Sequence, residues 1–198
     1  MTGATSSCAG VVLAGGTSRR MGGVDKTMLD VGGRTILDRV LGTLTAAEVG
    51  PLVVVGEQRA VSYPVRWARE DPPGGGPVAG LAAGLSEVTA SRVVVVAGDL
   101  PFLDVATVAA LRDALGPEIA AVGAIVVDAT GRDQPLVGCW STDALRVALP
   151  SAPAGTSMWR LIAPLQVVRI PAGMPLLDCD TPYELDMARA IAAREEQE

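Results

Sequence analysis

The stretch VVLAGGTSRRMGGVDK, from Val11 to Lys26, joins a short apolar run to a glycine-rich loop that carries three basic residues. The apolar run, Val11–Ala14, is typical of a strand that is buried on both faces of a parallel sheet. Glycines allow the backbone that follows to turn with positive φ and to pass close to a bound group. Consecutive N–H groups in such a loop form an anion-binding concavity, and Arg19, Arg20 and Lys26 add fixed positive charge beside it. The stretch therefore predicts a strand that ends at a phosphate-binding loop.

The rest of the chain alternates strand-like runs with longer segments of helical periodicity. We expect strands at Val11–Ala14, Leu52–Val55, Val93–Ala97, Ala124–Val127 and Gln166–Ile170, and helices at Thr35–Val49, Pro77–Val88 and Val105–Leu115. Thr35 and Asp104 are suitable N-caps for the first and third helices. Because such alternation indicates βαβ units, we predict a Rossmann-like three-layer α/β sandwich with a mostly parallel central sheet.

The order of elements changes after Ile125. A turn at residues 130–132 precedes a second run, Pro135–Trp140, which predicts a small antiparallel β excursion in the C-terminal half. Such an excursion would cover the open side of a ligand cleft. No internal repeat or low-complexity linker interrupts the chain, and 198 residues suit a single domain with a substantial core.

Composition narrows the functional classes. The formal net charge of −6 argues against nucleic acid or acidic membranes as partners, so the basic loop suits a small anionic ligand. The first residues do not resemble a signal peptide, and no apolar run approaches the ~20 residues that span a bilayer. Three widely spaced cysteines are expected to be free thiols, as in a reducing cytoplasm. The sequence has no histidine, which excludes His-dependent triads and His-ligated metal sites.

Acidic residues near predicted strand ends are candidate metal ligands. Asp99 directly follows the strand Val93–Ala97, at an edge where a carboxylate would hold Mg²⁺ against a triphosphate. As an alternative, Asp99 would simply cap the next helix. Asp178 and Asp180 share one face if the chain there is extended. One of them would complete the metal site, or else Asp180 or Thr181 would cap the helix that follows.

The loop REDPPGGGPVAG, from Arg69 to Gly80, has few side chains able to do chemistry. Its glycines and prolines would offer a backbone surface to a flat base, with Asp71 as an acceptor for the N–H groups of guanine. The alternative is a plain loop into a helix.

The motifs LAGGTSRRMGGVDK, DPPGGGPVAGL, GDLPFL, DQPLVGCW and DCDTPYEL, in this order and spacing, resemble the molybdenum cofactor guanylyltransferases, the MobA family of nucleotidyltransferases. The resemblance extends over nearly the whole chain. It implies an α/β sandwich that binds GTP and Mg²⁺. It also implies transfer of GMP to the terminal phosphate of a molybdopterin-type acceptor, with release of pyrophosphate. The nucleotide-binding half would span about residues 9–115 and the acceptor-binding half about residues 116–198.

The resemblance assigns roles to individual residues. It implies nucleotide contacts from Leu13, Ala14, Gly15 and Gly16, triphosphate contacts from Arg20 and Lys26, a place in the GTP site for Asp71, and Mg²⁺ bound by Asp99. Arg20, Lys26 and Asp99 would be the catalytic group, and Asp180 is the candidate second metal ligand. Phosphoryl transfer needs positioning and charge neutralisation more than a covalent catalyst, so a chain without histidine can perform it.

Three features depart from the family pattern. Family members commonly carry basic residues in the stretch matching SAPAGTSMWRLI, where they meet the pterin phosphate, but here only Arg160 is basic. The polar residue that follows the family's second strand has no clear match here. The closing motif DCDTP resembles that of cytidylyl-transferring relatives, whereas LAGG matches the guanylyl family rather than the cytidylyl LAAG.

These features leave alternatives to GTP and to an enzyme. GTP is the expected substrate, with CTP as the alternative. A nucleotide-binding protein that acts in molybdoenzyme maturation is the alternative of another class, and transient contact with molybdoenzymes or cofactor-synthesis proteins suits either.

Overall fold

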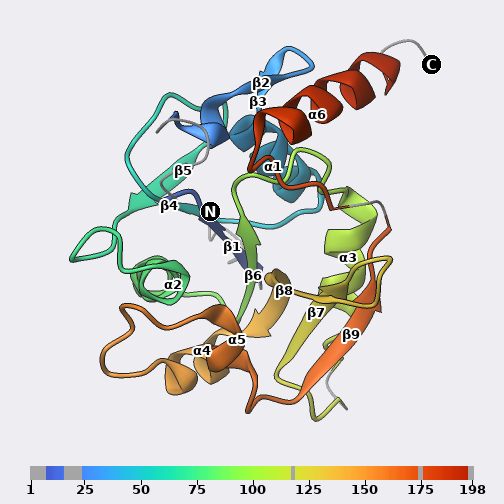
Figure 1. Cartoon of the computed structure of the whole chain (residues 1–198). Helices are drawn as coiled ribbons and strands as arrows, with labels where there is room; N and C mark the ends of the chain where they lie inside the picture. Colours follow the sequence, from blue (N-terminus) through green and yellow to red (C-terminus); the bar gives the residue numbers. More distant parts are fainter. Residues whose placement is uncertain (1–7, 16–23, 117–118, 174–175, 196–198) are drawn as a thin grey trace, which may run out of the picture.

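The computed structural model describes residues 8–15, 24–116, 119–173 and 176–195, and a seven-stranded sheet forms its centre (Figure 1). The strands are β1 (Cys8–Leu13), β4 (Leu52–Val55), β5 (Val65–Ala68), β6 (Arg92–Ala97), β7 (Gly123–Val127), β8 (Asp133–Ser141) and β9 (Val167–Pro171). Their order across the sheet is β5-β4-β1-β6-β8-β7-β9. β8 pairs antiparallel with β6 and with β7, and the other pairs are parallel. The mostly parallel sheet and its antiparallel excursion are therefore confirmed.

Helices cover both faces of this sheet. They are α1 (Ile36–Ala46), α2 (Pro77–Ser86), α3 (Val105–Asp113), α4 (Thr142–Ala148), α5 (Met158–Ile162) and α6 (Pro182–Glu195). α1 and α3 lie on one face, and α2, α4 and α5 lie on the other (Figure 1). The buried side chains of each group join a separate core cluster with the strands. The predicted three-layer sandwich is confirmed.

Strand side chains alternate between the two layers. In β6, Val94 and Val96 join the core beneath α1 and α3, whereas Val93 and Val95 join the core beneath α2, α4 and α5. All four are fully buried. The continuous apolar runs of the sequence therefore arise because these central strands are covered on both sides.

A third, smaller core lies where residues 29–36 meet α6. A 3-10 turn, η2 (Lys26–Met28), leads into two short paired strands, β2 (Asp30–Val31) and β3 (Arg34–Thr35). Val31 packs with Leu185, Ala188 and Ala192 of α6. This packing holds the start of α6 close to η2, near the carboxyl ends of β1 and β6.

Several element boundaries differ from those predicted. The first strand begins at Cys8 rather than Val11, because Cys8 and Ala9 already pair with β6. α1 ends at Ala46 rather than Val49, since Glu48 adopts a φ of 57° that ends the helix. Thr35 and Asp104 cap their helices as predicted, accepting hydrogen bonds from the N–H groups three residues on.

Two further expectations concern the cysteines and the membrane. None of the three cysteines forms a disulfide, as predicted, and all three are buried. No helix in the described residues has the length and apolar character needed to cross a membrane.

Candidate functional site

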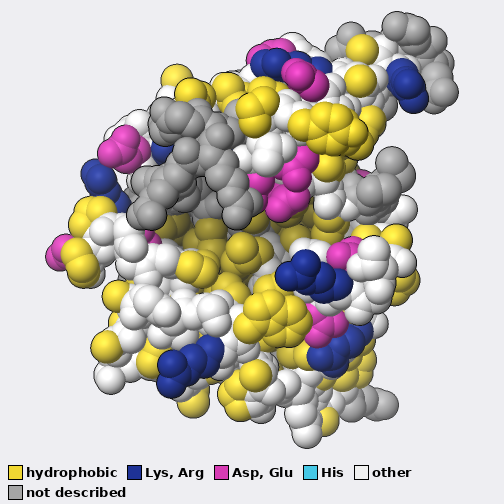
Figure 2. Space-filling model, in the orientation of Figure 1, with side chains coloured by type: hydrophobic (Ala, Val, Ile, Leu, Met, Phe, Trp, Pro, Cys, Tyr) yellow, Lys and Arg dark blue, Asp and Glu magenta, His cyan; other side chains and the backbone are white. Residues whose placement is uncertain are grey.

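A cavity of about 840 Å³ opens at the carboxyl edge of the sheet. The ends of β1, β4 and β6 supply its apolar floor, including Leu13, Ala14, Val55 and Ala97. Its walls come from the loop before α2, the turn between β7 and β8, and the segment 176–180. Figure 2 shows the hollow, with hydrophobic side chains on its floor and acidic groups along one edge. This is where ligands bind in open α/β sheets.

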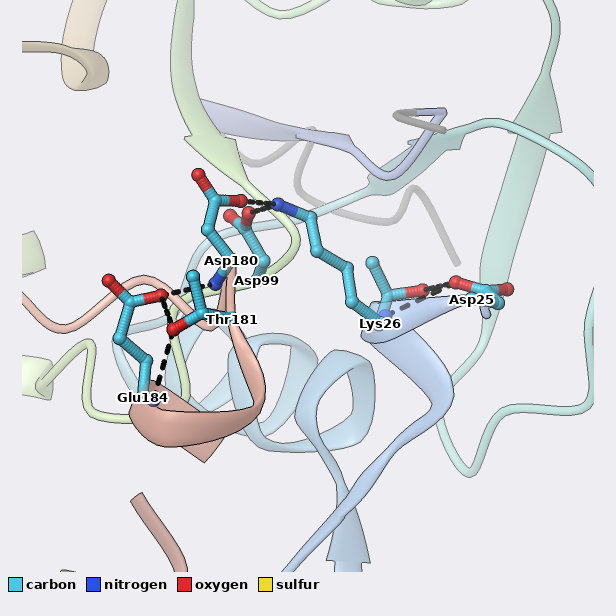
Figure 3. Close-up of polar contacts among 7 residues, drawn as sticks. Asp25, Lys26, Asp99, Asp180, Thr181 and Glu184 are labelled. Atoms are coloured by element: carbon cyan, nitrogen blue, oxygen red, sulfur yellow. Dashed lines mark hydrogen bonds and ion pairs between the residues drawn. The ribbon is translucent and has the colours of Figure 1, made fainter. Parts of the chain in front are cut away.

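Lys26 lies between two carboxylates at this cavity (Figure 3). Its ammonium group contacts Asp99 Oδ2 and Asp180 Oδ1. The side chains of Lys26 and Asp99 are 15% and 14% exposed, whereas that of Asp180 is 41% exposed. Burial opposes the charge on Lys26, but Asp99 and Asp180 outweigh this effect and raise the pKa of the lysine above its usual value. Lys26 therefore stays charged over the physiological pH range.

Strand ends and a capped turn position Lys26 and Asp99. Gly98 donates its N–H to the carbonyl oxygen of Leu13 at 2.9 Å, which places Asp99 next to the end of β1. Asp25 caps η2, since its Oδ1 accepts from the N–H of Thr27 at 3.2 Å and from its hydroxyl at 2.8 Å. The other oxygen of Asp25 pairs with Arg59, which follows β4. The backbone at Lys26 is thus held by side chains on either side of it.

A helix start positions Asp180. The N–H of Asp180 and the hydroxyl of Thr181 both donate to Glu184 Oε2, at 3.0 and 2.9 Å, and the N–H of Glu184 donates to Thr181 Oγ1 (Figure 3). This reciprocal arrangement is a variant of the capping box at the start of α6, in which Glu184 accepts from the N–H of Asp180 in place of that of Thr181. The N–H of Cys179 also donates to the carbonyl oxygen of Asp99 at 3.3 Å, which ties the segment to the end of β6.

The two carboxylates suit a hard cation. Asp99 and Asp180 converge on the single positive group of Lys26, and Mg²⁺ is commonly held by one or two carboxylates together with substrate phosphates. Asp178 lines the same cavity, and partial burial together with the charge of Asp180 raises its pKa. In the described part of the chain, no group of three or more Asp, Glu or Cys side chains could hold a metal by itself. Substrate oxygens would therefore have to supply the remaining ligands.

Most of the sequence-predicted site residues lie together. Leu13, Ala14, Gly15, Lys26, Asp99, Asp178 and Asp180 all line the cavity. Gly16 and Arg20 lie outside the described residues, so their roles stay predictions. Asp71 is exposed and is not among the lining residues, and its place in a GTP site also stays a prediction.

The neighbour of Asp71, Glu70, does line the cavity, and sequence reasoning missed it. Its Oε1 accepts from the N–H of Gly74 at 2.7 Å and so fixes the glycine loop before α2. Gly74 and Gly76 have φ angles of 82° and 89°, which explains why this loop requires glycine. The signal in the sequence was an acidic residue, Glu70, shortly before a run of glycines whose N–H groups its carboxylate could accept from.

Two other lining residues were also missed. Arg132 lies in the turn between β7 and β8, and Trp159 lies on α5. The sequence placed Arg132 in a turn and gave it no further role. Trp159 belongs to the stretch SAPAGTSMWRLI, which was examined only for basic residues.

The comparisons with known proteins agree with this geometry. The family model described as the MobA-like NTP transferase domain matches residues 10–170. A molybdenum cofactor guanylyltransferase from Bradyrhizobium sp. strain ORS 278 is 34% identical, over 98% of this chain and 97% of that one. A second, from Mesorhizobium japonicum, is 36% identical over 70% of each chain.

The fold agrees with a solved structure as well. A crystal structure titled molybdopterin-guanine dinucleotide biosynthesis protein A, from Archaeoglobus fulgidus, superposes with a TM-score of 0.71. It covers 94% of this chain and 99% of that one at 22% identity, which supports the shared fold. With a family model that matches most of its length and relatives above 30% identity, the chain belongs to the MobA-like NTP transferase family.

Proposed function

We propose that this protein transfers GMP from GTP to the terminal phosphate of a molybdopterin-type acceptor, in a Mg²⁺-dependent reaction that releases pyrophosphate. The observation that carries the proposal is the convergence of Lys26, Asp99 and Asp180 at a cavity of about 840 Å³. Relatives named molybdenum cofactor guanylyltransferase, one of them similar over almost the whole chain, support the choice of nucleotide and acceptor.

The residues of the site have separate roles in the proposed phosphoryl transfer. Asp99 and Asp180 would hold Mg²⁺, which when bound neutralises charge on the triphosphate. Lys26 supplies a fixed positive charge to phosphate oxygens, and Leu13, Ala14 and Gly15 shape the floor beneath the nucleotide. An oxygen of the acceptor phosphate bonds to the α-phosphorus of GTP, and the bond from that phosphorus to the β-phosphate oxygen breaks. The acceptor phosphate is already ionised near neutral pH, so no general base is needed.

CTP is the second candidate nucleotide, because the segment at Asp178 and Asp180 resembles the cytidylyl-transferring relatives. That segment, however, contacts Lys26 of the proposed phosphate and metal site. The base is expected at the glycine loop before α2, so this segment would not select it. GTP therefore remains the preferred substrate. Three cysteines without a disulfide suit a protein of the reducing cytoplasm, which is where we place it.

The experiment incubates the protein with Mg²⁺, each nucleoside triphosphate, and either metal-free or molybdenum-loaded molybdopterin. Mass spectrometry identifies the dinucleotide, and released pyrophosphate gives the rate. We expect GTP to exceed CTP and ATP by roughly 10²-fold in kcat/KM, because a site that hydrogen-bonds exocyclic groups rejects bases that leave its polar groups unpaired. Equal or better use of CTP would overturn the nucleotide assignment. GTP binding without pyrophosphate release would indicate a binding protein instead.

A further inference from the structure

Acidic side chains outnumber basic ones around the main cavity. Among its described lining residues, the cations are Lys26 and Arg132, and the acids are Glu70, Asp99, Asp128, Asp133, Asp178 and Asp180. Lys26 is already paired with two carboxylates. No carboxylate of the described residues lies within ion-pair distance of Arg132, which leaves it as the uncompensated cation of this group. A cavity that takes two phosphorylated substrates needs such a charge.

The turn that carries Arg132 is held in one shape. Asp128 Oδ1 accepts from the N–H and hydroxyl of Thr130 at 2.9 and 2.6 Å and from the N–H of Arg132 at 3.1 Å. Its Oδ2 accepts from the side chain of Gln134 at 2.8 Å. These bonds, chiefly the one from the Thr130 hydroxyl, lower the pKa of Asp128 to about 2. The carboxylate is therefore satisfied by the turn, and it does not pair with the Arg132 guanidinium.

The next acidic residue along this wall is also satisfied. Asp133 receives two parallel hydrogen bonds from Arg169 of β9, from Nε to Oδ1 at 2.9 Å and from Nη2 to Oδ2 at 2.8 Å. Such fork-to-fork pairing leaves Asp133 little capacity to compete for Arg132. The guanidinium of Arg132 is thus available to a ligand, in the planar geometry that suits phosphate.

An aromatic side chain completes the same wall. Trp159 lies at the start of α5, lines the main cavity and is 44% exposed, whereas the neighbouring Met158 is 3% exposed. A large, half-exposed aromatic residue that lines a cavity can pack against the flat ring of a ligand. Arg160, the basic residue in the stretch that meets the pterin phosphate in the family, lines instead a separate cavity of about 510 Å³ beside α4.

We propose that Arg132 and Trp159 form the acceptor subsite, in which Arg132 binds the phosphate of the acceptor and the Trp159 ring packs against its flat heterocycle. This inference rests on the proposed function, because it takes the acceptor to be a phosphorylated pterin. It assigns the phosphate contact to the turn between β7 and β8 and not to α5. The acceptor wall, the nucleotide floor and Asp99 all line the same cavity.

The test compares acceptor and nucleotide parameters in matched variants. Arg132→Ala should raise the KM for metal-free molybdopterin by roughly tenfold or more, the scale of one lost charge-assisted hydrogen-bond pair, with the KM for GTP unchanged. Arg132→Lys should restore part of this loss, because it keeps the charge without the planar fork. Arg160→Ala is the control, a neighbouring cation outside the cavity, and it should leave both KM values unchanged.

A binding measurement gives a readout independent of turnover. Metal-free molybdopterin should quench tryptophan fluorescence in the wild-type protein. Trp159→Phe should abolish most of the quenching yet retain affinity, whereas Trp159→Ala should weaken binding by roughly tenfold, the scale of one lost stacking contact. With a ligand that lacks the phosphate, wild type and Arg132→Ala should bind with equal affinity.

The outcomes separate the two proposals. An acceptor KM that depends on Arg160 and not on Arg132 would overturn the subsite while leaving the transferase assignment in place. Unchanged quenching in Trp159→Phe would contradict the proposed contact between Trp159 and the heterocycle. A wild-type protein that neither binds molybdopterin nor uses it with any triphosphate would overturn both proposals.

Discussion

Asp99 and Asp180 contact the same ammonium group but differ in burial, with 14% and 41% of their side chains exposed. Asp99, the more buried of the two, is fixed at the end of β6. Loss of its charge should therefore weaken Mg²⁺ binding more than loss of the charge on Asp180. We expect Asp99→Asn to lower turnover by roughly 10²–10³-fold, the scale of one lost preorganised electrostatic contact, because a neutral amide is a poor ligand for a hard cation. Asp180→Asn should cost less and mainly raise the Mg²⁺ concentration needed for half-maximal rate.

Initial rates across a Mg²⁺ titration measure both effects. Asp113→Asn, at an exposed acid on the far end of α3, is the control and should behave as wild type. A larger loss for Asp180→Asn than for Asp99→Asn would place the principal metal ligand in the DCD segment.

A second prediction for a single residue concerns Gly15. A Cβ built there would lie 3.7 Å from the carbonyl oxygen of Val55, an ordinary contact, so the fold itself does not demand glycine. The residue lines the cavity, and an added methyl group would therefore meet the ligand. We expect Gly15→Ala to melt within about 2 °C of wild type, since surface changes without clashes stay near 0.5 kcal/mol.

The same variant should lower kcat/KM for GTP while leaving that for CTP less affected, because a purine needs more room than a pyrimidine. Paired kinetic measurements with the two nucleotides check this. An unchanged ratio would mean that Gly15 lies away from the base.

At the scale of elements, the capping box of α6 links stability to the site. Thr181→Ala removes the hydroxyl that accepts from Glu184 and donates back to it. We expect a loss of about 1 kcal/mol in the free energy of unfolding, typical of a lost N-cap. Because the same turn holds Asp180, the Mg²⁺ requirement of the reaction should also rise.

The matched control is Asp104→Ala, which removes the cap of α3 on the sheet face that carries α1. It should destabilise the protein to a similar extent without changing the Mg²⁺ requirement. Chemical denaturation and metal titration together distinguish the two variants. Equal shifts in Mg²⁺ requirement would mean that stability alone accounts for the effect of Thr181.

Long elements with local signals were predictable, and short elements held by tertiary contacts were not. The central strands were found because both of their faces are buried, and α1 and α3 because Thr35 and Asp104 mark their starts. β5 was missed, since Val65–Ala68 is a half-buried strand at the edge of the sheet, where its partner in the sheet is β4. The short helices α4 and α5 were missed too, although Ser141 and Ser157 cap them.

The site shows the same division. Asp99 was predictable because it follows an apolar run, and Lys26 because it is a basic residue of the glycine-rich loop whose motif resembles the family's. The contact between Lys26 and Asp180 joins residues far apart in sequence and depends on the packing of α6 against β2. Arg132 reaches the cavity only because β8 inserts between β6 and β7. No local pattern in the sequence encodes that insertion.

On the scale of the whole molecule, both halves of the chain share each core. Cys8 and Val94 pack in one cluster with Ala124 and Cys139, and β6 and β8 are direct neighbours in the sheet. We therefore expect one cooperative unfolding transition, as in a single domain. Far-UV circular dichroism and tryptophan fluorescence should give the same denaturant midpoint, because Trp67, Trp140 and Trp159 sample an edge strand, the sheet centre and the acceptor wall.

GTP at about 100 times its Kd should move that single transition upward by about 2.7 kcal/mol. Two separated transitions, with only one of them moved by GTP, would instead indicate two domains that unfold independently.

The ion pair between Lys26 and Asp180 also has a consequence for the order of events during protein synthesis. Chains emerge from the ribosome with the N-terminus first, and early segments begin to fold before later ones exist. The strands β1, β4 and β6 can assemble with the glycine loop before α2 well before residue 180 has been made, because α6 and its capping box follow these elements by more than 80 residues. A nascent chain would therefore hold a nucleotide floor that lacks one of its two carboxylates. The proposed pair of carboxylates is complete only after Asp180 has been made, so a chain cut off before this residue is expected to need a higher Mg²⁺ concentration for the same rate.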